Sequence, residues 1–462
     1  PQFLNGNKIR TFNYCVANPP FSIKRWSTDL TKDYERFSEF GRPPENCADY
    51  AFLLHMLKSM DSKKGRGAII LPHGVLFRGG QEAVIRENLV RSGLIEGIIG
   101  LPGNLFYGTG IPACIIILDK KGADKRKDIF MIDSGKCFVK EGNKNKLREE
   151  DIRKITDIYL NRIEENKFSR IIKFEEIEKE GFNLNLPRYI DSSEENETQD
   201  IKAHLLGGIP KTDIKKFERF WKVAPNLKNT LFKDNTKKGY LDLSVEKDEV
   251  NETINNSTEI LEYTEKLKQE INCWEEKSKI DLEKVNSDTR VKELIEILSD
   301  YILNIFKKDS LIDKYDAYEY LMEYYSEEMK DDLHLIIDGG WIPKLTFGKD
   351  KNGRFKKNEF DSELLPKQII IEEYFSIENE EIDVLNDKLN SIISEFDSII
   401  EENTGDETLF SEDDKINEKI IKDMLKDIQY EESFEILKKL LNNIIEQKNV
   451  KKEIKQKQEE LD

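Results

Sequence analysis

The stretch Thr11-Phe12-Asn13-Tyr14-Cys15-Val16-Ala17-Asn18-Pro19-Pro20-Phe21 decides the fold of the first part of this chain. The residues up to Ala17 form an apolar run rich in β-formers, which predicts a buried strand. Asn18, Pro19, Pro20 and Phe21 then follow at the carboxyl end of that strand. Ligands bind at this edge of open α/β sheets, so we expect a functional site there.

The residue types in Asn18-Pro19-Pro20-Phe21 suit the transfer of a methyl group to an exocyclic amine, a poor nucleophile because its lone pair is delocalised into the ring. The amide oxygen of Asn18 and the carbonyl between the two prolines can accept both N–H groups of that amine. Proline fixes φ and donates no N–H, so this carbonyl is rigid. Phe21 would stack on the base. The alternative is a strand followed by an ordinary proline-rich turn.

Composition limits the possible classes of protein. A chain of 462 residues predicts two or three domains, and 35% charged with 38% hydrophobic residues fits a soluble, helix-rich protein. No signal peptide or membrane span is evident, and the widely spaced cysteines indicate a cytoplasmic protein without structural zinc. The net charge of −18 argues against non-specific binding of nucleic acid over the whole surface, but not against a local basic groove or a partner subunit.

Strands and helices alternate up to about residue 190. After the opening strand, a long polar loop leads to a helix, a strand, a helix and two strands, predicted over residues 48–60, 68–71, 81–92, 95–101 and 113–119. This alternation predicts an α/β domain whose sheet is of parallel type and could close with an antiparallel hairpin.

Five blocks in this region resemble the modification (methyltransferase, HsdM-type) subunit of type I restriction–modification systems, a family of adenine-N6 DNA methyltransferases. The blocks lie at residues 17–21, 48–53, 71–80, 100–112 and 182–189. The resemblance implies an incomplete Rossmann-like methyltransferase sheet, followed by an all-helical carboxyl-terminal region that ends in coiled-coil-like helices.

The resemblance also implies roles for individual residues. Asn18 and the following carbonyl would hold the adenine amine, and Phe21 would stack on a base turned out of the duplex. Phe106 or Tyr107 could cover the opposite face of that base, although an aromatic pair packed on the rim of the sheet is the alternative.

Three basic residues, Lys24, Arg25 and Arg78, are candidates to contact DNA, with solvated side chains as the alternative. Gly108 and Gly110 would permit the tight backbone that aims the aromatic residues of their loop.

S-adenosylmethionine is the cofactor that the resemblance implies, and its site needs a glycine-rich turn after the first strand of the sheet. Only 17 residues precede Asn18, whereas one βαβ unit takes about 30. We therefore expect the chain to lack the amino-terminal part of the family and most of the cofactor pocket. No residue is assigned to the cofactor, the opening strand should present an unpaired edge, and the chain alone should not methylate DNA.

The rest of the chain reads as a polar, acidic linker over residues 191–200, a helical region over 201–345, a charged loop over 346–366, and a helical hairpin or coiled coil over 367–462. Two apolar seams run through the last segment. The first comprises Ile382, Leu385, Leu389, Ile392, Phe396 and Ile399, and the second comprises Ile416, Ile420, Met424, Leu437, Leu441, Ile444, Ile454 and Leu461.

The two seams permit two interpretations. They can pair as an antiparallel hairpin. The resemblance implies that they also dock on the coiled coil of a specificity subunit, and we favour this because so long an apolar stripe needs a partner.

The preferred function is that of a methyltransferase subunit which acts on a flipped adenine in DNA, in a complex with a specificity subunit and a restriction subunit. Two alternatives stay open. One is a methyltransferase that acts on RNA or on protein glutamine, and the other is a non-enzymatic assembly module that docks on the specificity subunit.

Overall fold

The computed structural model describes residues 4–5, 8–26, 36–193, 200–307, 311–349, 354–404, 409–410, 416–427 and 431–461. The chain divides into two units. The first comprises Pro1–Glu283 and Arg290–Glu327, and the second comprises Lys284–Thr289 and Glu328–Asp462. Most of the predicted acidic linker, residues 194–199, lies outside the described residues.

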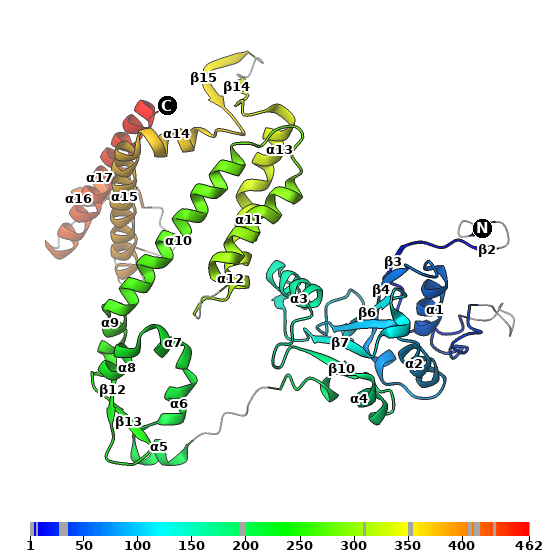
Figure 1. Cartoon of the computed structure of the whole chain (residues 1–462). Coiled ribbons are helices and arrows are strands. Elements are labelled where there is room, and N and C mark those ends of the chain that lie inside the picture. Colours follow the sequence, from blue (N-terminus) through cyan, green and yellow to red (C-terminus); the bar gives the residue numbers. More distant parts are fainter. Residues whose placement is uncertain are drawn as a thin grey trace. The chain divides into compact units, whose positions relative to one another are not determined.

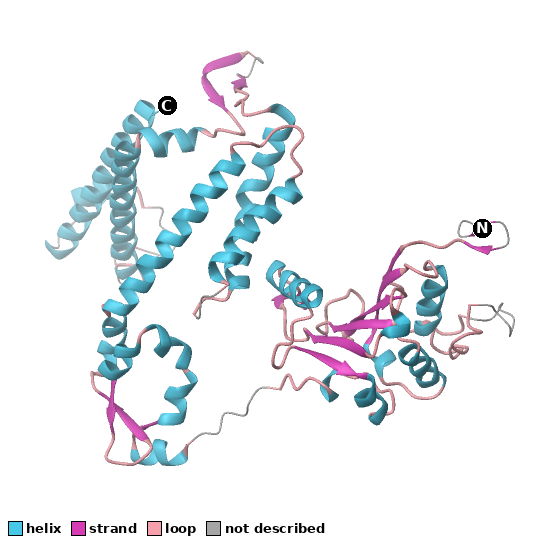
Figure 2. Ribbon diagram, viewed as in Figure 1, coloured by secondary structure: helices cyan, strands magenta, loops and turns pink. Residues whose placement is uncertain are grey.

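A six-stranded sheet forms the centre of the amino-terminal part of the first unit, up to about residue 190 (Figures 1 and 2). Its strands, in spatial order, are β10 (Ser169–Lys173), β7 (Asp128–Asp133), β5 (Ile95–Gly100), β6 (Ala113–Asp119), β4 (Arg66–Pro72) and β3 (Tyr14–Ala17). The pairs β3–β4 and β5–β7 are parallel, whereas β6 runs antiparallel to both β4 and β5. The predicted α/β sheet is therefore confirmed as a mixed sheet, because β6 inserts between its two parallel pairs.

Helices cover both faces of this sheet. On one face, α1 (Asp49–Ser59), α2 (Gln81–Arg91) and α4 (Phe174–Lys179) pack in one apolar core with the strands. On the other face, α3 (Glu149–Asn161) packs over β5 and β7. Each helix contributes a stripe of apolar residues at helical spacing, which explains why the sequence predicted α1 and α2 to within two residues.

Strand β3 is the outermost strand of the sheet, and one of its faces is uncovered. Cys15 and Ala17 pack on the core beneath α1, whereas Tyr14 is 78% exposed and Val16 86% exposed. No strand of the described part of the chain pairs with the outer edge of β3. Two short strands precede it, β1 (Leu4–Asn5) and β2 (Lys8–Ile9), and they pair with each other in a separate hairpin.

Helices dominate the remainder of the first unit. They are α5 (Ile201–Leu206), α6 (Lys211–Lys216), α7 (Glu218–Val223), α8 (Pro225–Leu231), α9 (Val250–Asn255), α10 (Thr258–Leu282), α11 (Val291–Phe306) and α12 (Lys314–Tyr324). A small antiparallel sheet interrupts them, formed by β11 (Ile209–Pro210), β12 (Phe232–Asp234) and β13 (Tyr240–Leu243). The helical region is thus confirmed, but it is not entirely helical.

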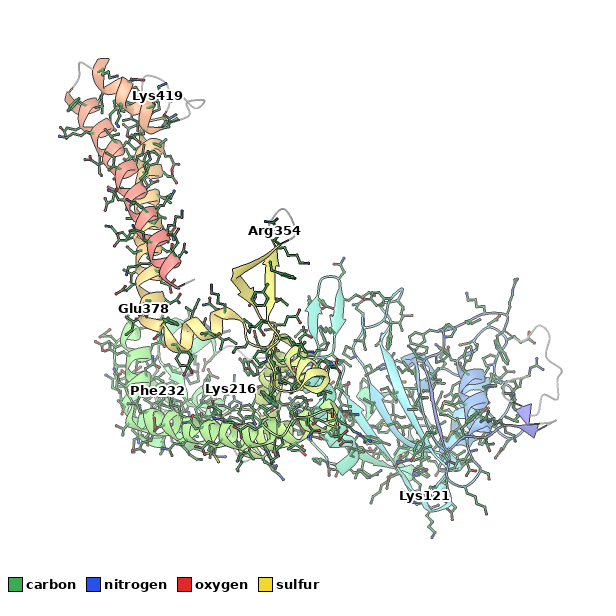
Figure 3. The ribbon with its side chains drawn as sticks, turned by 90° about the horizontal axis from the view of Figure 1, so that it is seen from above. Lys121, Lys216, Phe232, Arg354, Glu378 and Lys419 are labelled. Atoms are coloured by element: carbon green, nitrogen blue, oxygen red, sulfur yellow. The ribbon has the colours of Figure 1, made fainter. Side chains whose placement is uncertain are left out.

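The second unit begins with α13 (Lys330–Gly339) and continues with an antiparallel hairpin of β14 (Thr346–Lys349) and β15 (Phe355–Asp361). The prediction of a charged loop over residues 346–366 is therefore wrong for its two arms, which form strands and contain phenylalanine, a residue type that favours strands. Figure 3 labels Arg354 next to the start of β15. The described residues include no helix that is long and apolar enough to cross a membrane.

The carboxyl-terminal helices are α14 (Lys367–Tyr374), α15 (Ser376–Glu402), α16 (Glu418–Asp427) and α17 (Glu431–Leu461). Helix α15 lies along α17 (Figure 1). Ion pairs join Lys388 to Glu446 at 3.0 Å and Glu395 to Lys439 at 2.8 Å, so the two helices run in opposite directions. Figure 3 labels Glu378 in the first turn of α15 and Lys419 in the first turn of α16.

The predicted apolar seams meet each other in this helical hairpin. All members of the first seam belong to two apolar clusters, one shared by α15, α16 and α17 and the other by α15 and α17. In the second seam the prediction of Ile420 is wrong, because Ile420 is partly exposed and its neighbour Ile421 is fully buried. The side chain of Leu461 lies outside the described residues. Because the seams cover each other, their length no longer argues for an external partner.

Candidate functional site

The predicted site lies at the carboxyl end of β3, where Ala17 pairs with Ile69 of β4. Asn18 follows directly and is exposed, and its side chain makes no hydrogen bond to any residue that the structure describes. Pro19 is half-buried, and Phe21 is half-buried in the turn that comes next. The Asn18 amide is therefore available to a ligand at the edge of the sheet.

A buried carboxylate fixes the turn after Phe21. Asp49, the first residue of α1, is fully buried, and its Oδ1 accepts the backbone N–H of Ser22 at 2.8 Å. The Ser22 hydroxyl lies 3.4 Å from the other carboxylate oxygen. Ser22 has a φ of 53°, a left-handed conformation that costs a non-glycine residue energy, and these bonds offset that cost. Asp49 thus determines the direction in which the chain leaves the site.

Arg78 neutralises this carboxylate. Its Nη1 donates to Asp49 Oδ2 at 2.8 Å and to Glu82 Oε1 at 3.2 Å, and it lies 3.0 Å from Cys47 Sγ. Burial raises the pKa of Glu82, and burial raises the pKa of the Cys47 thiol to about 11. Cys47 therefore stays protonated and donates to Asp49 Oδ2 at 3.1 Å.

The group formed by Cys47, Asp49 and Glu82 has the residue types and the proximity of a metal site. Here the Arg78 guanidinium supplies the positive charge between them. These side chains and Arg78 therefore form a charge network that supports the site. The contact of Arg78 with DNA stays a prediction, and its side chain is 31% exposed.

The rings of Phe21 and Phe106 pack edge to face, with centroids 5.6 Å apart and planes at 76°. Two residues that lie far apart in the sequence thereby meet at one edge of the sheet. Tyr107, in contrast, is 95% exposed. A base cannot lie between two rings that are already in contact. Phe106 therefore supports the ring of Phe21, and of the two candidates for a second base contact Tyr107 is the one with an exposed ring.

Two glycines shape the loop that carries Phe106. Gly108 has a φ of +78°, which favours glycine, as the sequence predicted. Gly110 matters for a different reason: its carbonyl accepts the N–H of Asn104 at 3.2 Å, and a Cβ at this glycine would lie 2.8 Å from the Asn104 side-chain oxygen. The hydrogen bond between Asn104 and Gly110 therefore closes the loop.

Lys24 and Arg25 lie in the exposed turn that follows Ser22. The backbone N–H of Arg25 donates to the Glu45 carbonyl at 3.0 Å, and Trp26 Nε1 donates to the Pro44 carbonyl at 2.9 Å. The start of the polar loop is therefore held against the segment before α1.

Buried Arg86 links two of the sequence blocks in space. Its Nε donates to the Phe182 carbonyl at 2.7 Å, and its Nη1 donates to the carbonyls of Val75 and Arg78 at 3.1 and 2.9 Å. Residues 71–80 and 182–189 thus form one assembly behind the site. The sequence did not predict these roles for Asp49 and Arg86, although a charged residue at an apolar helical position is a signal of this kind.

The segment that carries this site is similar in sequence to known proteins. Residues 2–198 match the N-6 DNA Methylase family. The chain is 38% identical over 204 residues to the type I restriction enzyme MjaVII methylase subunit of Methanocaldococcus jannaschii, covering 42% of this chain and 35% of that protein. It is 36% identical over 206 residues to the MpnII methylase subunit of Mycoplasma pneumoniae, covering 44% of this chain and 37% of that protein.

Among solved structures, the type I restriction–modification methyltransferase subunit from Streptococcus thermophilus is 42% identical, with a TM-score of 0.38, over 40% of this chain and 39% of that one. The chain spans little more than a third of the length of the curated relatives it matches. The matched segment is the one that carries the sheet, the Asn18-Pro19-Pro20-Phe21 turn and the Phe106 loop. Residues 2–198 are therefore similar to the N-6 DNA Methylase family and to the methylase subunits of type I restriction enzymes.

Proposed function

We propose that this chain is part of a methyltransferase subunit that transfers a methyl group to the N6 amine of an adenine turned out of duplex DNA. One observation carries the proposal: in an N-6 DNA methylase domain, the exposed Asn18 amide and the rigid Pro19 carbonyl stand at the carboxyl edge of the sheet, beside the supported ring of Phe21.

The proposed chemistry is one of orientation. The Asn18 amide oxygen and the Pro19 carbonyl each accept one N–H of the adenine amine, which holds its lone pair toward the incoming methyl group. Phe21 stacks on one face of the base, Phe106 supports the ring of Phe21, and Tyr107 covers the opposite face. Lys24 and Arg25, exposed in the adjoining turn, contact the DNA backbone.

S-adenosylmethionine would supply the methyl group. No helix begins among the described residues before Asn18, so those residues offer no helix N-terminus or glycine-rich turn to hold this cofactor. The described residues therefore do not fit a cofactor site upstream of Asn18, and we assign none of them to it.

We also propose that the subunit works in a complex with a specificity subunit and a restriction subunit. The support is its similarity to proteins named as subunits of type I restriction enzymes. Tyr374, Ile377 and Val384 are largely exposed at the joined ends of α14 and α15, and they would contribute apolar contacts. Mixing the chain with a purified specificity subunit on a size-exclusion column tests this association.

Tritiated S-adenosylmethionine tests the activity. The complete subunit that contains this chain is offered duplex DNA, RNA and protein, and the modified base is identified by mass spectrometry. We expect N6-methyladenine in DNA, loss of incorporation with Asn18→Ala, and no loss with the exposed control Asn13→Ala. Label in RNA or protein would establish the alternative methyltransferases. No label in any substrate, together with retained binding to a specificity subunit, would establish an assembly module.

A further inference from the structure

A small hairpin beyond the sheet is directed at the Phe106 loop. Its strands are β8 (Val139–Glu141) and β9 (Lys144–Lys146), which pair antiparallel. The side chains of both strands are exposed or half-buried, and none belongs to an apolar core cluster. The hairpin therefore contributes little to the packing of the sheet, and its role has to be sought in its polar contacts.

Those contacts converge on the loop. Lys144 Nζ donates to the Phe106 carbonyl at 2.7 Å and lies 3.3 Å from the Thr109 carbonyl. Asn145 donates through its side-chain Nδ2 to the Gly103 carbonyl at 2.7 Å, and through its backbone N–H to the Asn104 carbonyl at 3.1 Å. Two adjacent residues thus bind four carbonyls distributed along the loop.

Backbone carbonyls in such a loop have no partners in a helix or sheet ladder. An ammonium group carries three donors and can bridge two carbonyls that point to one position. Hydrogen bonds from a charged donor are also stronger than neutral ones. Lys144, which is half-buried, is thus placed to hold the carbonyl of the residue whose ring touches Phe21.

We propose that Lys144 and Asn145 are positioning residues for the Phe106 loop, residues 103–111. They hold its backbone so that Phe106 keeps the ring of Phe21 in place for stacking. The consequence of this positioning, the stacking of a base on Phe21, rests on the proposed function. The holding of the loop by the hairpin is independent of that function and can be measured separately.

The first test measures the loop itself by hydrogen–deuterium exchange of the purified chain. Lys144→Met removes the ammonium and keeps the apolar stem. We expect the amides of residues 103–111 to exchange about tenfold faster or more, as the loss of a charged hydrogen bond implies. Amides of β4 and β6 should be unchanged. Lys146→Met, two residues along the same strand and exposed, should leave the loop unchanged, and Lys144→Arg should restore much of the protection.

The second test measures the consequence with a DNA duplex that carries 2-aminopurine at the unstacked end of a single-stranded overhang, where its fluorescence is high and falls when it stacks on an aromatic ring. We expect quenching with the wild-type chain, loss of most of it with Lys144→Met, and partial recovery with Lys144→Arg. Equal exchange of the loop in wild type and Lys144→Met would overturn the inference. Faster exchange without any quenching by the wild type would support the positioning role and contradict the proposed base contact.

Discussion

Asp49 and Ser22 are joined by a hydrogen bond of 2.8 Å from the Ser22 backbone N–H to the buried carboxylate. This bond connects the start of α1 to the turn directly after Phe21, and Arg78 supplies the compensating charge. The site therefore depends on a charge network beneath it, and this network can support the site without contacting a substrate. Such a network holds its geometry only while both ionic partners are present.

Replacing Asp49 tests this dependence. Asp49→Asn keeps an acceptor for Ser22 but removes the charge beside Arg78, so we expect the free energy of unfolding to fall by about 1–3 kcal/mol. Urea unfolding of the variant measures the loss. Arg78→Met combined with Asp49→Asn should cost less than the sum of the single changes, because each single variant already breaks the pair. Additive losses would show that the two residues are not coupled.

The sheet and its helices could be predicted from the sequence because apolar periodicity is a local signal. Residues 113–119 were predicted as a strand and form β6 with the same bounds. The position of β6 between β4 and β5 could not be predicted, since periodicity does not specify which strands pair. The apolar run Ile129-Phe130-Met131-Ile132 is a signal of the same kind for β7.

The site was predictable in part for the same reason. Asn18 and the residues after it form one continuous stretch, whereas the contact between Phe21 and Phe106 joins distant segments. Lys144 carries no local signal that separates it from the many other lysines of the chain. Its role follows only from where the β8–β9 hairpin places its ammonium group.

The edge-to-face contact between Phe21 and Phe106 should be measurable as a coupling energy. Ring pairs of this geometry contribute about 0.5–1.5 kcal/mol beyond their buried area. A double-mutant cycle of Phe21→Leu and Phe106→Leu, followed by urea unfolding, should return a coupling in that range. Tyr107→Leu serves as the comparison, because its exposed ring should show no coupling to Phe21. Equal coupling for both loop residues would contradict the arrangement described here.

Glu150, at the start of α3, should make stability depend on pH. Burial first, and then the charges of Asp316, Asp151 and Glu319, raise its pKa to about 7, although its ion pair with Arg148 acts in the opposite direction. The folded state therefore binds a proton that the unfolded state releases above about pH 4.3. As the pH rises through this window, the stability contributed by that proton is lost.

Glu150→Gln mimics the protonated side chain at every pH. We expect the variant to gain stability over the wild type as the pH rises from about 4.5 to 7.5, with no further gain above that range. Urea midpoints across a pH series measure the difference, and Glu149→Gln, an exposed neighbour, is the control. A difference that stays constant with pH would show that the raised pKa of Glu150 has no effect on folding.

Two adjacent isoleucines of α16 test the observed packing of the carboxyl-terminal helices. Ile421 is fully buried against α15 and α17, whereas Ile420 is partly exposed. We expect Ile421→Ala to destabilise the helices by about 2–4 kcal/mol and Ile420→Ala to change them by less than about 0.5 kcal/mol. Hydrogen exchange of the α16 amides reports this local stability. A larger effect at Ile420 would restore the register predicted from the sequence.

The open face of β3 should govern the solubility of the chain. Tyr14 and Val16 expose apolar surface on a strand whose outer edge is unpaired within the described residues, which is a template for pairing with another chain. Val16→Lys places a charge on this face. We expect it to lower the rate of aggregation, followed by light scattering, and to change the free energy of unfolding by no more than about 0.5 kcal/mol. Val84→Lys adds the same charge to an exposed position of α2, so an equal reduction there would assign the effect to net charge and not to the edge of the sheet.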